Sequence, residues 1–195
     1  MKTITKEYQV YTYDELSEEA KEKVRNSFGI NDSDIETDTL KDGFKYLIEE
    51  KYPYFEDTDF IWSLGNSQGD GLSFSSTLNL KLFIEKELPN LKHKKAMAEL
   101  VFSVISRSNR GNYCYPLESD IDFEYNYTNK SFGHLEKLFN DEVLPVIQKK
   151  YMEVCSDLER KGYAAYDYLY SDENARENSE ANDYTYLKNG EMFNV

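Results

Sequence analysis

Long hydrophobic segments are missing from this sequence. No run of about 18 apolar residues, the length that a membrane-spanning helix needs, occurs in its 195 residues. The first residues, MKTITKEYQVY, have no apolar core of the kind found in an export signal. These absences predict a cytoplasmic protein that is neither exported nor inserted into a membrane.

Cysteine and histidine are scarce. The two cysteines, Cys114 and Cys155, are far apart and form no CxxC pattern, and the only histidines are His93 and His134. This set argues against a structural zinc site and, in a reducing cytosol, against a disulfide. Neither histidine has an evident nucleophile or carboxylate partner in the sequence, so no catalytic triad is predicted.

Motifs for catalysis or cofactor binding are also lacking. QGDG at 68–71 has neither the following helix nor the lysine of a phosphate-binding loop, and no serine occupies a GxSxG elbow. Residues 32–43 alternate carboxylates like a calcium loop, but Thr37 stands at the sixth position and Gly43 at the twelfth, where glycine and glutamate are required. We therefore expect no catalytic residue, cofactor or metal ion.

Basic residues are few and unevenly distributed. The chain has 23 Lys and Arg against 37 Asp and Glu, a formal net charge of −14. Three windows contain no base, and each holds four acids: Asp32, Asp34, Glu36 and Asp38; Glu56, Asp57, Asp59 and Asp70; Glu118, Asp120, Asp122 and Glu124. Residues 81–110, in contrast, hold seven bases and three acids. Such a surface repels nucleic acid and attracts basic proteins, although it can also serve solubility alone.

Apolar periodicity predicts an α+β fold in which helices cover an antiparallel β-sheet. Strands are expected at 3–13, 59–65, 72–84 and 119–129, and helices at 17–28, 39–52, 92–107 and 132–163. The acidic, tyrosine-rich segment 163–183 is expected to continue as helix, and Asn189-Gly190 predicts a β-hairpin at 184–195. Residues 32–38 are expected to form a loop in which Asp38 caps the next helix. No linker or repeat divides the chain, so a single domain over 1–195 is predicted.

The stretch WSLGNSQGDGLSFSSTL at 62–78 places Asp70 between Gly69 and Gly71. The simplest interpretation is a hairpin connection, because glycine accepts positive φ and an aspartate can bond to the backbone of its own turn. The alternative is a loop that contacts a partner.

A row of carboxylates is predicted on the strand 119–129. Asp120, Asp122 and Glu124 alternate with apolar residues, and side chains two residues apart on a strand lie about 7 Å apart on one face. That spacing is similar to the spacing of phosphates along a DNA strand. The alternative is an edge strand that its charges keep from aggregating.

Three stretches together resemble a family of small uncharacterised proteins encoded by phages and mobile elements: YTYDELSEEAKEKVR, WSLGNSQGDGLSF and YLKNGEMF. The resemblance transfers no catalytic residue. Small acidic proteins of this origin resemble, as a class, anti-CRISPR proteins and anti-restriction DNA mimics. This implies a non-catalytic inhibitor in the bacterial host cytosol that binds a Cas nuclease or a restriction enzyme and does not itself bind nucleic acid.

Ten acids are the candidate partner-binding residues of such an inhibitor: Asp32, Asp34, Glu36, Asp57, Asp59, Asp70, Glu118, Asp120, Asp122 and Glu124. Two other functions stay open at this point. One is a phage structural or regulatory interaction protein whose acidic surface only keeps it soluble. The other is an enzyme whose site no motif reveals.

Overall fold

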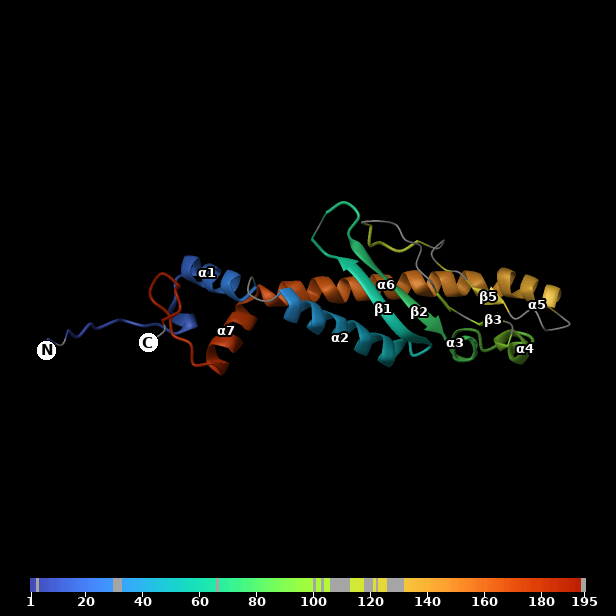
Figure 1. The fold of residues 1–195 in the computed structure, drawn as a ribbon, viewed down its shortest axis with the longest axis horizontal. Helices are drawn as coiled ribbons and strands as arrows, with labels where there is room; N and C mark the ends of the chain where they lie inside the picture. The colour runs from blue at the N-terminus through green and yellow to red at the C-terminus, as the bar shows by residue number, and fades with distance from the viewer. Residues whose placement is uncertain are drawn as a thin grey trace. The chain divides into compact units, whose positions relative to one another are not determined.

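The computed structural model describes most of the chain as two compact units (Figure 1). The described residues are 1–2, 4–29, 33–65, 67–99, 101–102, 104–105, 113–117, 121, 123–125 and 132–193. Unit 1 consists of Met1–Thr39 and Tyr163–Val195, and unit 2 of Leu40–Gly162. The chain passes from one unit to the other within helices α2 (Ser33–Lys51) and α6 (Leu144–Leu169). The α+β class is confirmed, whereas a single domain over 1–195 stays a prediction.

Unit 1 is built from the 3₁₀ turn η1 (Tyr13–Glu15), helix α1 (Glu18–Gly29) and helix α7 (Asp172–Ala181). The Ser171 hydroxyl accepts a hydrogen bond of 3.1 Å from the Asn174 amide, which caps the start of α7. The buried hydrophobic side chains described in this unit form one cluster: Tyr13, Leu16, Ala20, Val24, Ala175 and Tyr186. Residues from both ends of the sequence therefore share this core.

The C-terminal hairpin of unit 1 is confirmed. Tyr186 and Met192 form an antiparallel bridge, and the Leu187 amide donates to the Glu191 carbonyl at 2.8 Å. Gly190 has a φ of 84°, the left-handed conformation that an Asn-Gly turn requires.

The predicted N-terminal strand is wrong. Residues 4–10 form no strand, and only Tyr11 makes a bridge, to Tyr186. Ile4, Tyr8 and Val10 are exposed, so the alternating pattern has no apolar face to bury, and burial is what normally fixes a strand in a sheet.

Unit 2 contains an antiparallel sheet in the order β1 (Phe55–Ser63), β2 (Gly71–Leu78) and β4 (Val104–Ile105). A second sheet pairs β3 (Val101–Phe102) with β5 (Glu124–Tyr125). The other elements formed by the described residues of this unit, besides its parts of α2 and α6, are α3 (Leu80–Glu87), α4 (Lys94–Ala98), α5 (Phe132–Leu138) and the π-helical turn η3 (Phe139–Val143).

Helices cover the β1–β2 hairpin, as the sequence predicts (Figure 1). The Phe44 ring of α2 lies 5.6 Å from the Phe60 ring of β1, centroid to centroid. The Tyr151 ring of α6 lies 4.9 Å from the Phe74 ring of β2, and its hydroxyl donates to the Phe74 carbonyl at 2.9 Å. This bond satisfies a polar group that is buried together with the apolar core.

The strand predicted at 72–84 ends earlier, at Leu78. The Asn79 side chain accepts a hydrogen bond of 3.0 Å from the Leu82 amide and thereby caps helix α3. Leu80 and Leu82, which continue the alternating pattern of β2, therefore belong to a helix.

Two other predicted elements are corrected. Among the described residues of the helix expected at 92–107, only α4 is helical, and β3 and β4 follow it, because the β-branched residues Val101, Val104 and Ile105 favour strands. The loop expected at 32–38 is helical from Ser33 onward, since α2 starts there. The helix expected at 132–163 is confirmed as α5, η3 and α6, with Pro145 in the first turn of α6, where its missing amide proton is tolerated.

Candidate functional site

Four of the ten predicted partner-binding acids have described side chains, and all four lie in unit 2. Asp57 and Asp59 are exposed on β1, Glu124 is exposed on β5, and Asp70 is half-buried immediately before β2. Asp57 has a φ of 51° and lies in the irregular stretch where the β1–β2 register shifts. Asp59 forms an ion pair of 3.8 Å with Lys41.

The side chains of the other six acids lie outside the described part of the structure. Asp34 and Glu36 lie in α2, with side chains outside the described residues, and Asp32 lies outside them entirely. Glu118, Asp120 and Asp122 are also outside the described residues, so the row of carboxylates at 120–124 stays a prediction.

Asp70 organises the hairpin turn that contains the QGDG stretch. Its carboxylate accepts hydrogen bonds of 2.5 Å from the Ser63 hydroxyl and 2.5 Å from the Ser67 amide. Both bonds lower the pKa of Asp70, and the bond from Ser63 has the larger effect. Gly69 and Gly71 both have positive φ, 95° and 145°. The predicted hairpin is confirmed, and the contact of this loop with a partner stays a hypothesis.

Negative charge is concentrated in unit 1. This unit contains 17 Asp and Glu against 7 Lys and Arg, a formal charge of −10. Unit 2, although larger, contains 20 acids against 16 bases, a formal charge of −4. The sequence shows acidic windows, but only the fold reveals that residues 1–39 and 163–195 combine their charge in one unit.

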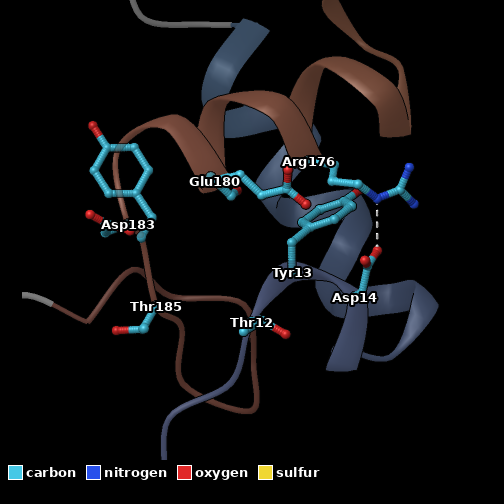
Figure 2. Close-up of a pocket in the computed structure, with 9 residues that line it drawn as sticks. Thr12, Tyr13, Asp14, Arg176, Glu180, Asp183 and Thr185 are labelled. Atoms are coloured by element: carbon cyan, nitrogen blue, oxygen red, sulfur yellow. Dashed lines mark hydrogen bonds and ion pairs between the residues drawn. The ribbon is translucent and has the colours of Figure 1, made fainter.

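Unit 1 also contains an open groove of about 500 Å³ (Figure 2). It lies between the start of η1, the last turns of α7 and the residues that follow α7. Its lining combines carboxylates, tyrosines and one base: Thr12, Tyr13, Asp14, Arg176, Ser179, Glu180, Asp183, Tyr184 and Thr185. The Arg176 guanidinium donates to the Asp14 carboxylate at 3.0 Å, the pair marked by the dashed line in Figure 2.

Tyr13, which lines this groove, also connects η1 to α1 and α7. Its hydroxyl donates to Asp172 at 2.5 Å, and Arg25 forms an ion pair of 2.5 Å with the same carboxylate oxygen. Burial, followed by the bond to Asp172, raises the pKa of Tyr13 to about 12. The Tyr13 bond and then Arg25 lower the pKa of Asp172. The sequence contains no signal for this cluster, because Asp172 lies 147 residues after Arg25 and 159 residues after Tyr13.

The raised pKa of Tyr13 predicts a loss of stability in alkali. In the unfolded chain this phenol ionises near pH 10, whereas in the folded protein it ionises near pH 12. Its stabilising contribution is therefore complete below pH 10 and decreases as the pH rises toward 12. We expect the melting temperature of the wild type to fall more steeply over this range than that of Tyr13→Phe. Parallel curves would contradict the role assigned to this hydroxyl.

In the described part of the chain, no group of three or more His, Cys, Asp and Glu side chains could hold a metal ion. None of the described helices combines the length and the apolar character needed to cross a membrane.

Comparisons with known proteins found no match to this chain among protein-family models, curated proteins or solved structures.

Proposed function

We propose that the protein is a non-catalytic inhibitor of a basic nucleic-acid-binding defence protein, a Cas nuclease or a restriction enzyme. Its carboxylates occupy the channel that binds DNA and replace the phosphates there. The observation that carries this proposal is the charge of −10 in unit 1. A field of this strength and sign speeds the encounter with a basic partner and disfavours nucleic acid.

Helix α7 provides an ordered part of this charge. Glu173, Glu177 and Glu180 are all exposed, and their spacing of four and three residues places them along one side of the helix. The rise of the helix separates successive members by about 6 Å and about 4.5 Å along its axis. A basic channel that recognises the closely spaced charges of a DNA strand would meet a similar row of anions here.

Inhibition and its salt dependence test the proposal. The wild-type protein is added to a panel of purified Cas nucleases and restriction enzymes, and DNA binding is followed by fluorescence anisotropy. We expect it to displace DNA from at least one member. We also expect its association rate with that member to fall about tenfold or more as NaCl rises from about 0.05 to 0.5 M, because salt screens electrostatic steering.

Two results would contradict the proposal. One is a lack of inhibition across the panel at a large molar excess, which would favour an acidic surface that serves only solubility. The other is inhibition with an association rate that salt does not change. Neutralising Asp120, Asp122 and Glu124 in the same assay shows whether the predicted row in unit 2 adds to the contact.

A further inference from the structure

The only two histidines of the protein lie side by side in unit 2. Their ring centroids are 6.4 Å apart, and the ring planes are inclined at 78°. His93 immediately precedes α4, and His134 is the third residue of α5, so separate elements bring the rings together. Both side chains are exposed.

We propose that His93 and His134 together bind one transition-metal ion of the Zn²⁺, Ni²⁺ or Cu²⁺ class. A neutral imidazole offers one ring nitrogen with a free lone pair, and these ions are the ones that imidazole ligands suit. With a metal–nitrogen distance of about 2.0–2.1 Å and a tetrahedral angle, two rings on one ion have centroids about 5 Å apart. The rings therefore need to approach by roughly 1 Å, which rotation of two exposed side chains supplies.

The surroundings define which ions fit. Lys94 and Lys95 follow His93 in the sequence, and Lys137 lies one helical turn after His134. Mg²⁺ and Ca²⁺ depend on carboxylate and carbonyl oxygens, which a pair of imidazoles does not supply. Since the described residues contain no group of three or more metal-binding side chains, water completes the coordination shell. The structure thus assigns an open two-histidine site with selectivity for imidazole-preferring metals.

Metal binding at this site has a structural consequence. An ion held by both rings connects the start of α4 to α5 and is bound only by the folded chain, because the two histidines are 41 residues apart in the sequence. It therefore stabilises unit 2 in proportion to the logarithm of the metal concentration.

Calorimetric titration of the full-length protein without an affinity tag tests this inference. ZnCl₂ and NiCl₂ are titrated into the wild type, His93→Gln, His134→Gln and the neighbouring control Lys92→Gln, in a buffer that does not bind metals. We expect one ion per chain in the wild type and in Lys92→Gln, and an affinity lowered about 100-fold in either histidine variant, because the second ligand no longer acts at a high effective concentration. Zn²⁺ should raise the melting temperature only of the two proteins that keep both histidines, and EDTA should reverse the rise.

Four outcomes would overturn the inference. The first is no detectable binding to the wild type, and the second is equal affinity in all four proteins, which would place the metal on carboxylates. The third is a stoichiometry of one ion per two chains, which would indicate a bridge between molecules. The fourth is a melting temperature that rises equally with Mg²⁺, which would indicate a general effect of divalent cations.

Discussion

Phe74→Ala is expected to destabilise the protein by about 3–5 kcal/mol, the usual cost of removing a fully buried phenylalanine. The Phe74 side chain has no exposed surface. Its ring contacts three others, with centroid distances of 5.2 Å to Phe55, 6.2 Å to Phe60 and 4.9 Å to Tyr151. Truncation removes the common member of these pairs and leaves a cavity between the hairpin and α6. Denaturant unfolding followed by circular dichroism measures the loss.

Ile61→Ala is the matched control for this change. Ile61 lies on the neighbouring strand β1 but is 44% exposed, so its truncation should cost about 1 kcal/mol or less. A Phe74→Ala protein as stable as Ile61→Ala would contradict the packing assigned to the core of unit 2.

Gly71→Val is expected to lower the stability by at least about 2 kcal/mol, because a β-branched residue resists positive φ. Gly71 has a φ of 145°, and a Cβ atom there would lie 2.9 Å from the Cα atom of Tyr115, a backbone atom that cannot rotate away. Asp70→Asn should have a much smaller effect, since an amide oxygen can still accept one of the turn bonds. Thermal melts of both variants measure the difference.

Gly133→Val provides the comparison, because Gly133 in α5 has no neighbouring atom within 4 Å of a Cβ position. This variant should change the stability by less than about 1 kcal/mol, because valine and glycine differ little in helix propensity. If Gly71→Val melts like the wild type but no longer inhibits its target, the hairpin loop is a contact surface and its glycines are not required for folding.

Local signals in the sequence were sufficient for much of the fold. The helix from Glu18 was predictable from its four-residue apolar spacing, the β1–β2 hairpin from the glycines around Asp70, and the C-terminal hairpin from Asn189-Gly190. Each of these depends on interactions between residues that are close in the sequence. The predicted bounds were wrong where a side-chain hydrogen bond or tertiary contacts decide where an element ends. An example is Asn79, which caps α3 directly after β2 and thereby ends the strand.

The candidate site was less predictable. The sequence shows that Asp14, Arg176 and Asp183 are charged, but not that they line one groove, because their meeting depends on the packing of α7 against η1 and α1. The contact between His93 and His134 was also unpredictable, because it too depends on the packing of separate elements. The composition shows that acids exceed bases. That most of this excess lies in unit 1 could be seen only once the fold was known.

The proposed function requires the carboxylates of unit 1 to compete with DNA for a basic partner. Its most direct test compares two proteins of equal net charge, each lacking three exposed carboxylates. One is Glu173→Gln/Glu177→Gln/Glu180→Gln in unit 1, and the other is Glu85→Gln/Asp141→Asn/Glu142→Gln in unit 2. The measurement is the concentration of each protein that displaces half of the DNA from an inhibited Cas nuclease or restriction enzyme.

We predict that the unit 1 variant displaces half of the DNA only at a concentration at least about tenfold higher than the wild type, because it loses carboxylates that face the channel. The unit 2 variant should stay close to the wild type. Circular dichroism melts of both variants should match the wild type closely, since all six side chains are exposed. Equal displacement by the two variants, whether both are weakened or neither is, would contradict the claim that the acids of unit 1 make the contact.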